Sequence, residues 1–274
     1  MTDRYFHCIL IPGQKKAGTT TLYNHLADHL PHRASVPKES SVLDSAPWLF
    51  ALYGLARRFK GRVLLDATTT YFKGGEFSPA FRRNLTRFNR VSAVIIHRRE
   101  VDRMTSHFRH SAAFDGWTGT PAAFLESAEY IDNAYINPKV MALRELGVTD
   151  IHIVPFEVLN DPARLRMLMA TVLGQEIGPL LGGKLVENRF GKRALVPRPV
   201  EQLVATPLFQ AAIRPLIPST LRGWIKTLLA RSPEAASATR AAPDIRLTEA
   251  MAARLEGIEA ENGALGTKDG IRRW

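Results

Sequence analysis

The fold is decided by residues 5–26, which read YFHCILIPGQKKAGTTTLYNHL. Tyr5–Ile11 is a short, mostly apolar run that ends at Pro12-Gly13, which is typical of a buried parallel strand. Leucines then recur every four residues within Thr19–Leu30, which predicts a helix with one apolar face. A strand, a glycine-containing turn and a helix in this order predict the opening βα unit of an α/β fold.

The turn between this strand and this helix carries the chemistry. Backbone N–H groups and the positive end of the helix dipole face whatever lies at a helix N-terminus, so such a turn attracts anions. Gly13 and Gly18 let the backbone approach a ligand closely, and Lys15 and Lys16 add positive charge. The threonines that follow supply hydroxyls. The sequence therefore predicts a cradle for a phosphate or phosphosulfate group.

The same loop is close to the ATP-binding phosphate loop, G-x-x-x-x-G-K-[ST], but departs from it. Gly13 and Gly18 have the required spacing, whereas Thr19 stands where that motif has lysine, and Lys16 precedes the second glycine instead. The stretch RVLLD ends at Asp66, which imitates the metal-binding aspartate of such proteins. A nucleotide-dependent kinase or NTPase, which would need Mg²⁺ and ATP, is therefore the alternative function. The structural alternative is that GTTT only caps a helix.

The sequence beyond residue 30 alternates between strand and helix patterns. Apolar runs predict further strands at 62–66, 91–97 and 150–155. Helices are expected at 46–59, 101–110, 133–146 and 247–261, the last with Thr248 as N-cap and Gly263 past its end. This alternation predicts one α/β domain spanning 1–274, with a central, mostly parallel sheet of four or five strands and helices on both faces.

The composition predicts a soluble globular protein that binds an anion. Of the 274 residues, 45% are hydrophobic and 23% are charged, which is ordinary for a packed domain. The net charge of +11 favours a nucleotide, a nucleic acid or an anionic membrane surface as partner. The basic residues form no single block, and the aromatic residues, 8% of the chain, form no stripe. A non-catalytic nucleic-acid-binding protein is therefore only the second alternative, and no nucleic-acid partner is expected.

Further sequence features concern location. The single cysteine, Cys8, excludes an internal disulfide and lies in an apolar run, which suits a buried thiol in a reducing compartment. The sequence has no run of about 20 apolar residues that would predict a spanning helix. Residues 1–11 lack the pattern of a signal peptide. We therefore expect a cytoplasmic protein.

At the loop, the sequence resembles the bacterial-type sulfotransferases that use 3′-phosphoadenosine-5′-phosphosulfate (PAPS). The family opens with a strand, a K-x-G-T-T-x-L loop and a helix, and Lys16, Gly18 and Leu22 occupy these positions with the two threonines between them. The resemblance implies that the loop holds the 5′-phosphosulfate and that Lys16 stabilises the leaving phosphate as it gains charge. The implied loop residues are Lys15, Lys16, Ala17, Gly18, Thr19, Thr20 and Thr21.

A second match is independent of the first. The family places an arginine at the end of a strand and a serine eight residues later, and both hold the 3′-phosphate of PAPS. Arg98 and Ser106 have this spacing. An arginine fork and a hydroxyl suit a phosphate dianion. Glu100 stands where the family usually has proline, which puts an anion near the site.

A third match concerns the proton acceptor of the reaction. In VPKESS, Lys38 and Glu39 resemble the family branch that sulfates glycosaminoglycans, in which the glutamate takes the proton of the acceptor hydroxyl. The competing base is a histidine, as in the branch that acts on small molecules. His97, His107 and His110 are the nearby histidines, but they lie close to the 3′-phosphate motif, which suits them less to this role.

Later stretches match as well. LLDATTTYF resembles a family stretch that lines the acceptor side, with Ala67 in place of a lysine of the glycosaminoglycan branch. The ending through Trp274 resembles the closing helix and terminal tryptophan of many bacterial members. Residues 200–229 are amphipathic and leave open an acceptor lid, a peripheral membrane contact or a plain pair of core helices. The expected members of a basic loop that closes over PAPS are Asn188, Gly191, Lys192 and Arg193.

The resemblance implies a reaction and its participants. A sulfuryl group would pass from PAPS, by in-line displacement at sulfur, to a hydroxyl of a carbohydrate, glycolipid or small-molecule acceptor. The product 3′-phosphoadenosine 5′-phosphate (PAP) would then leave. Lys16 and Glu39 would be the catalytic residues, and the scheme needs no metal ion. The sequence indicates neither the acceptor nor the oligomeric state.

Overall fold

The computed structural model describes residues 5–30, 38–51, 63–178, 245–264 and 271–274. Its centre is a five-stranded sheet in the order β2-β1-β5-β6-β7, and every neighbouring pair is parallel. The strands are β1 (Tyr5–Leu10), β2 (Val63–Asp66), β5 (Phe88–His97), β6 (Asp150–Pro155) and β7 (Ile271–Arg273). The predicted α/β class with a mostly parallel sheet is confirmed.

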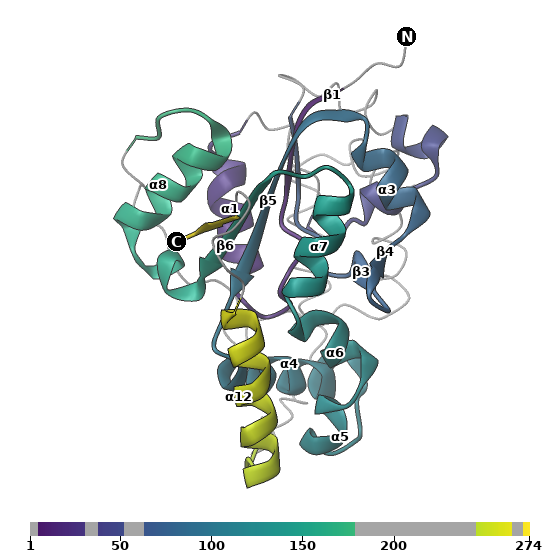
Figure 1. The fold of residues 1–274 in the computed structure, drawn as a ribbon, viewed down its shortest axis with the longest axis vertical. Helices are drawn as coiled ribbons and strands as arrows, with labels where there is room; N and C mark the ends of the chain where they lie inside the picture. Colours follow the sequence, from purple (N-terminus) through teal and green to yellow (C-terminus); the bar gives the residue numbers. More distant parts are fainter. Residues whose placement is uncertain (1–4, 31–37, 52–62, 179–244, 265–270) are drawn as a thin grey trace, which may run out of the picture.

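Helices cover both faces of this sheet because alternate side chains of an interior strand such as β1 point to opposite faces. Cys8 and Leu10 enter one apolar core, while Ile9 and Ile11 enter the other. The first core lies under α3 (Pro79–Leu85), α7 (Asn137–Glu145) and the hairpin of β3 (Phe72–Lys73) and β4 (Glu76–Phe77). The second lies under α1 (Thr19–Asp28) and α8 (Pro162–Leu173). Figure 1 shows these two helical layers on either side of the strands.

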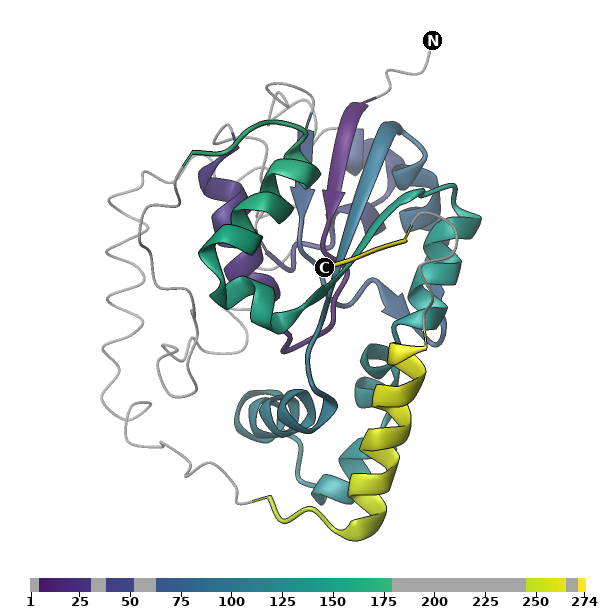
Figure 2. The same cartoon turned by 60° about the vertical axis from the view of Figure 1, so that its left-hand side comes forward.

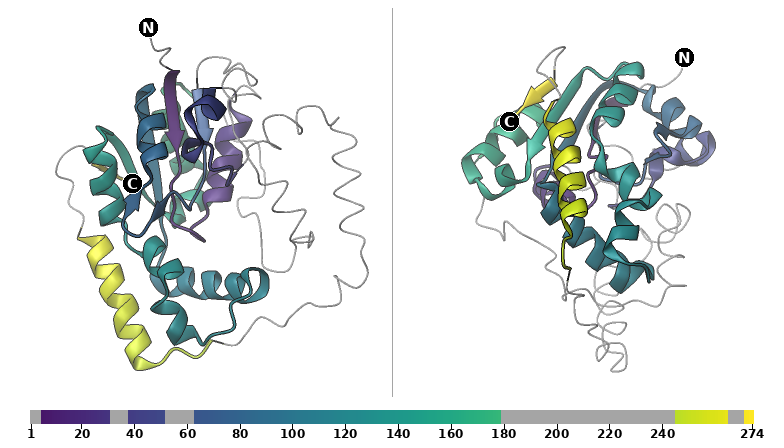
Figure 3. Two further views of the ribbon diagram at one scale, coloured as in Figure 1. Left: turned by 90° about the vertical axis from the view of Figure 1, so that its right-hand side faces the viewer. Right: turned by 60° about the horizontal axis from the view of Figure 1, so that its bottom comes forward.

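A separate group of helices gathers beyond the carboxyl ends of the strands (Figures 2 and 3). This group surrounds the third apolar core of the molecule, which includes Met104, Phe124, Tyr130 and Leu255. The helices are α4 (Glu100–His110), α5 (Pro121–Leu125), α6 (Ala128–Ala134) and α12 (Glu249–Gly263). The described fold also includes the short segments η1 (Val42–Asp44), a π-helical turn (Ser111–Asp115) and η4 (Phe156–Asn160).

Most predicted elements stand where the sequence placed them. The strand Asp150–Pro155 has the predicted bounds, and α12 begins after Thr248, whose hydroxyl accepts from the N–H of Met251 at 3.3 Å. Gly263 is the last residue of α12, not the residue after it. The helix predicted at 46–59 is described only from 47 to 51, and its remainder lies outside the described residues.

One predicted helix is wrong in its bounds. The expected helix at 133–146 is two helices, α6 and α7, that meet at Tyr135 and Ile136. Pro138 lies in the first turn of α7. A proline has no N–H to donate and disfavours helical backbone in the residue before it, so it begins a helix more readily than it continues one.

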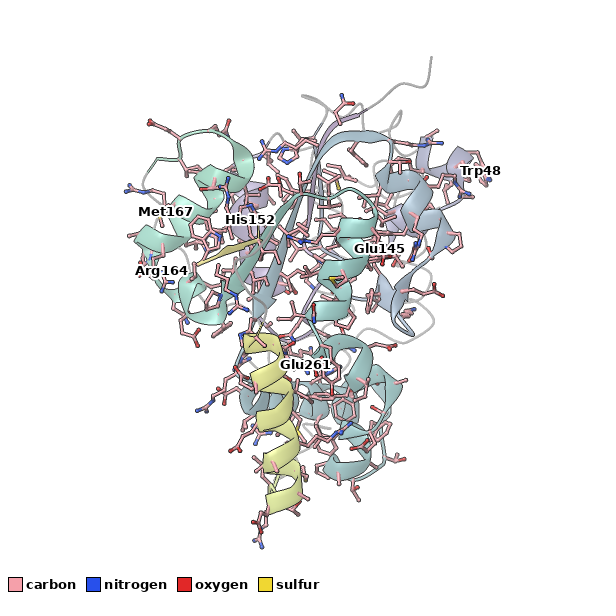
Figure 4. All side chains as sticks on the ribbon, viewed as in Figure 1. Trp48, Glu145, His152, Arg164, Met167 and Glu261 are labelled. Carbon is pink, nitrogen blue, oxygen red and sulfur yellow. The ribbon has the colours of Figure 1, made fainter. Side chains whose placement is uncertain are left out.

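The large apolar side chains on the surface are scattered. Trp48 and Met167 are exposed by 66% and 55%. They lie on opposite sides of the molecule, so they form no common apolar patch (Figure 4). Among the described residues, no helix combines the length and the apolar character needed to cross a bilayer.

Candidate active site

The predicted anion loop lies at the carboxyl edge of the sheet, between the ends of β2 and β5. The N–H of Ile11 donates to the carbonyl of Asp66 at 2.8 Å. On the other side, Gly13 and Gln14 form hydrogen bonds with the backbone of Ile96 at 3.1 and 3.2 Å. The loop is therefore fixed to both neighbouring strands at the edge where open parallel sheets bind ligands.

Gly18 is required by both its backbone conformation and its surroundings. It is the N-cap of α1 and has a φ of 91°, in the left-handed region. A Cβ atom there would lie 2.6 Å from Leu159 Cδ1 and 2.9 Å from Phe156 Cε2. The backbone thus packs tightly against η4. Helix geometry leaves the first N–H groups of α1 without partners inside the helix, so Thr19–Thr21 offer donors to an anion.

The side chains of the loop differ in exposure. Thr19 and Thr21 are buried, whereas Thr20 and Lys16 are half-buried. Ala17 is fully buried in the core under α1. The donors of this cradle are therefore mainly backbone N–H groups, together with Thr20 and Lys16.

The two loop lysines have different environments. Lys15 Nζ donates to Glu129 Oε1 at 2.8 Å and lies 3.7 Å from Asp115 Oδ2. Hydrogen bonds from His107, Lys15 and Ser111 hold the pKa of Glu129 well below its usual range. The charge of Lys15 is therefore neutralised within the protein, and Lys16 is the stronger candidate for contact with the ligand.

Arg98 meets the loop in space. It follows β5, and its Nη1 donates to the carbonyl oxygen of Lys16 at 3.1 Å. Its guanidinium also lies over the ring of Phe156, 4.7 Å from the centroid. Ser106 lies two turns into α4 and is half-buried. The structure thus brings Arg98 to the loop, although the two motifs are 82 residues apart.

Glu39 is held at the end of β2, at the same edge of the sheet. Its N–H donates to the carbonyl of Ala67 at 3.1 Å. Its carboxylate accepts from the N–H of Thr69 at 2.8 Å and from the Thr69 hydroxyl at 3.1 Å, and it pairs with Lys38 Nζ at 2.5 Å. The side chain of Glu39 is 39% exposed. A carboxylate that is fixed in direction yet reaches solvent is well placed to take a proton from a bound hydroxyl.

The histidines are less suited to that role. His107 is fully buried, and burial lowers its pKa to about 3. Its Nε2 is 3.1 Å from Glu129 Oε1, and its ring packs against Phe124. His97 is half-buried and faces Glu259, with Nε2 3.2 Å from Oε1. Neither ring lies at the end of β2, where Glu39 stands.

Asp66 does not resemble a metal-binding aspartate. It is fully buried, and its oxygens accept hydrogen bonds from the hydroxyls of Tyr71 and Thr68. Burial raises its pKa to about 7. Tyr71 also accepts from the N–H of Leu43, and Thr68 from the N–H of Ser41. Asp66 thus ties the segment after Glu39 to the end of β2.

Among the described residues, one group of histidine and carboxylate side chains is close enough together to be considered as a metal site. Ligand atoms of His97, Glu100 and Glu259 lie within 4.8 Å of one another. Both oxygens of Glu100, however, already accept from the guanidinium of Arg103, at 2.7 to 3.0 Å. Glu100 serves a buried salt bridge, and the arginine would repel a cation.

Some predicted residues lie outside the described part of the chain, and some features of the site were not predicted. Asn188, Gly191, Lys192 and Arg193 and the stretch 200–229 fall outside the described residues. No sequence motif predicted the buried polar cluster behind the loop, which is made by Gln14, Glu100, Arg103, Tyr130 and Lys139. Its sequence signal was Glu100, which stands where the sulfotransferases that the sequence resembles usually have proline.

No protein-family model matches the sequence, and no curated protein matches it significantly. The solved structures that match this chain include three sulfotransferases or sulfotransferase domains. The sulfotransferase from Alicyclobacillus acidocaldarius is 19% identical, with a TM-score of 0.47, over 78% of this chain and 98% of that one. The sulfotransferase domain from the curacin biosynthetic pathway is 12% identical, with a TM-score of 0.49, over 94% and 98%.

The third structure is the sulfotransferase domain of the olefin synthase from Synechococcus PCC 7002. It is 16% identical, with a TM-score of 0.41, over 82% of this chain and 92% of that one. At such identities and TM-scores the likeness carries no inference about activity, which has to rest on the residues of the site.

Proposed function

We propose that this chain is a PAPS-dependent sulfotransferase that sulfates a hydroxyl of a carbohydrate, glycolipid or other small acceptor. The observation that supports this best is the contact between two separately predicted motifs. Arg98, at the end of β5, donates to the carbonyl of Lys16 in the loop after β1. A nucleotide with phosphates at both its 3′ and 5′ positions needs cationic groups from two parts of the chain, and this contact fixes the Arg98 guanidinium against the backbone of the loop that carries Lys16.

The loop fits the 5′ end of such a nucleotide. Gly18 is packed so closely on η4 that a Cβ atom would clash, which fixes the backbone at the start of α1. The first turn of α1 presents N–H groups and the positive end of the helix dipole. Lys16 adds a full charge. This donor set suits a phosphosulfate better than a neutral group.

The proposed reaction is a displacement at sulfur. The acceptor oxygen forms a bond to sulfur, the bond from sulfur to the 5′-phosphate oxygen breaks, and PAP leaves. Glu39 takes the proton of the acceptor hydroxyl, and Thr69 holds its carboxylate in direction. Lys16 and the loop N–H groups stabilise the charge that moves onto the 5′-phosphate. Arg98 and Ser106 hold the 3′-phosphate.

The kinase alternative is not favoured. It needs an aspartate that faces the metal ion near the loop, and Asp66 is the residue that would supply it. Asp66 is fully buried and engaged by Tyr71 and Thr68. Position 19 is a threonine, so the lysine of the ATP-binding motif is also missing.

A thermal-shift comparison tests the proposal. PAP is expected to stabilise the protein in the presence of EDTA, whereas ATP with Mg²⁺ gives little or no shift. A specific ligand at about 100 times its dissociation constant adds about 2.7 kcal/mol to the free energy of unfolding, which is easily measured. Strong stabilisation by ATP with Mg²⁺ and none by PAP would overturn the proposal. If PAP stabilises the protein as expected, transfer of a radioactive sulfuryl group from PAPS to a panel of sugars and alcohols identifies the acceptor class.

A further inference from the structure

One buried lysine near the loop lacks a hydrogen-bond partner. Lys139 lies in the first turn of α7, and its side chain is fully buried. Its Nζ donates to no acceptor among the described residues. Nearby, Nη1 of Arg103 is also buried and unpartnered, although the other guanidinium nitrogens bind Glu100. Buried polar groups are nearly always satisfied, so two unpartnered cationic donors in one cluster call for a physical reason.

The ammonium of Lys139 lies against the start of the anion loop. A Cβ atom built on Gly13 would be 3.2 Å from Nζ, so the ammonium sits directly beside that residue. On its other side, Nζ lies 5.8 Å from the centroid of the Phe72 ring on β3. Figure 1 shows α7 and the β3–β4 hairpin together on one side of the sheet. Lys139 thus stands between the anion loop and the hairpin.

The charges around Lys139 do not compensate it. Arg103 and Glu100 approach it from α4, and Asp132 from α6. Glu100 is already neutralised by its salt bridge with Arg103, at 2.7 Å, and Asp132 accepts from the N–H of Gly74 at 3.0 Å. Burial first, and the charge of Arg103 second, lower the pKa of Lys139 to about 7. A buried ammonium without a counter-ion is costly, so it either loses its proton or gains an anion.

We propose that Lys139 is an anion-binding residue of this site, which takes up a proton and grips an oxygen at the 5′ end of the nucleotide when PAPS or PAP binds. The inference rests on the proposed function, because it takes the ligand of the loop to be the 5′ end of that nucleotide. The anion supplies the counter-charge that the protein leaves out, and the proton comes from the solvent. If Lys139 only filled space in the core, its protonation would not change when the nucleotide binds.

The proposal predicts a proton-linked affinity. At pH 8 the phosphates of PAP are almost fully ionised, so proton uptake on binding reports on the protein. We expect isothermal titration calorimetry at pH 8, in two buffers of different ionisation enthalpy, to show uptake of most of one proton by the wild-type protein. The affinity for PAP should fall up to tenfold per pH unit between pH 8 and pH 10.

Substitutions separate this role from a structural one. Lys139→Met keeps the shape of the side chain but removes the charge, so it should abolish the proton uptake and weaken PAP at least tenfold at pH 7.5. It should leave adenosine 3′-monophosphate unaffected, because that probe lacks the 5′ group. The same variant should raise the Tm of the free protein, since the folded state no longer has to deprotonate a buried lysine. Lys73→Met, an exposed lysine on β3, is the matched control and should change none of these values.

Each outcome bears on a definite claim. If the wild-type protein binds PAP without proton uptake, and Lys139→Met binds it equally well, the Lys139 inference is wrong and the proposed function stands. If the wild-type protein does not bind PAP, both fail. If Lys139→Met does not fold, the test is made with Lys139→Arg instead. An arginine stays charged, so that variant should bind PAP with no proton uptake, and uptake equal to that of the wild type would overturn the inference.

Discussion

Lys15 and Lys16 are neighbours with different expected roles, and this difference can be tested. Lys16→Ala should lower kcat by about 10²–10³ while changing the affinity for PAP much less, because its charge matters most when the leaving phosphate gains charge. Lys15→Ala is the matched control. Its ammonium is bound by Glu129, so its loss should change kcat far less. Steady-state kinetics and calorimetry of both variants make the measurement, and equal effects on kcat would contradict the assignment.

Glu39 should be needed for the chemical step and not for the nucleotide. Glu39→Gln is nearly isosteric and can still accept from Thr69, but it cannot take a proton. The expected loss in kcat is about 10²–10⁴, with PAP binding unchanged. Lys38→Met removes the ion-pair partner and should cost far less activity. An active Glu39→Gln enzyme would transfer the role of base to a histidine.

Arg98 should bind the 3′-phosphate of the nucleotide. Arg98→Ala is expected to weaken PAP at least tenfold more than adenosine 5′-phosphosulfate, which lacks that phosphate, because a hydrogen bond to a charged group is worth about 1.5–3 kcal/mol. Ser106→Ala should show a smaller loss with the same selectivity, and the two losses should not add, since both residues contact one phosphate. Equal weakening of both nucleotides would make Arg98 a structural residue that only fixes the loop through Lys16.

At the scale of elements, the packing of the loop on η4 sets the shape of the anion site. Gly18→Ala combines a left-handed backbone with a Cβ clash at 2.6 Å, so it should lower the free energy of unfolding by about 2 kcal/mol or more and abolish PAP binding. Gly147→Ala is the matched control. Its φ is also positive, at 80°, but its Cβ would meet nothing within 4 Å. It should cost about 1 kcal/mol and leave PAP binding intact. Chemical denaturation and calorimetry compare the two variants.

The strands differ in how closely the sequence predicts their bounds. β6 was predicted to the residue because it is a compact run of buried residues between turns. β5 begins three residues earlier than predicted, at Phe88, because exposed Asn89 and Arg90 still belong to the strand. β7 was missed, since two exposed arginines in an edge strand give no apolar pattern. Hydrophobic patterns report burial, and strand pairing extends beyond the buried residues.

The candidate site was predicted where its residues are close in sequence. The loop from Gly13 to Thr21 is a local motif, and the Arg98 motif is another, so the spacing of their residues is enough to predict both. Lys139 comes from α7 and reaches Gly13 only through the tertiary fold. Nothing in a Pro-Lys dipeptide at a helix start indicates a buried ammonium, so no sequence pattern could have identified it.

At the scale of the whole molecule, buried titratable groups predict how stability depends on pH. Burial raises the pKa of Asp66 to about 7, so the folded state binds its proton more tightly than the unfolded state, and this stability is lost as pH rises from about 4 to 7. Burial lowers the pKa of His7 to about 4, so its contribution has the opposite sign and grows between pH 4 and 6.5. The two effects oppose each other in the wild-type protein.

Substitution should separate the two effects. Asp66→Asn cannot ionise, so its free energy of unfolding should rise relative to that of the wild type by a few kcal/mol between pH 4 and pH 7. His7→Gln removes the opposing contribution, and its stability relative to the wild type should fall over the same range. Urea denaturation at pH 4, 5.5 and 7 measures both. A difference between Asp66→Asn and the wild type that does not change with pH would show that Asp66 is ionised throughout.

The position of β1 in the interior of the sheet, between β2 and β5, has a consequence for how the chain reaches this structure. Its two neighbours, β2 and β5, come much later in the sequence: Leu10 pairs with Asp66 on one side and with Ala93 on the other. A parallel pair cannot form through a tight hairpin, so long loops must close before β1 gains any partner. Folding should therefore be slow, on the millisecond-to-second scale of domains dominated by distant contacts. During synthesis, the apolar run of β1 leaves the ribosome well before its partners do. A chaperone that covers this run until β2 and β5 emerge should therefore reduce aggregation.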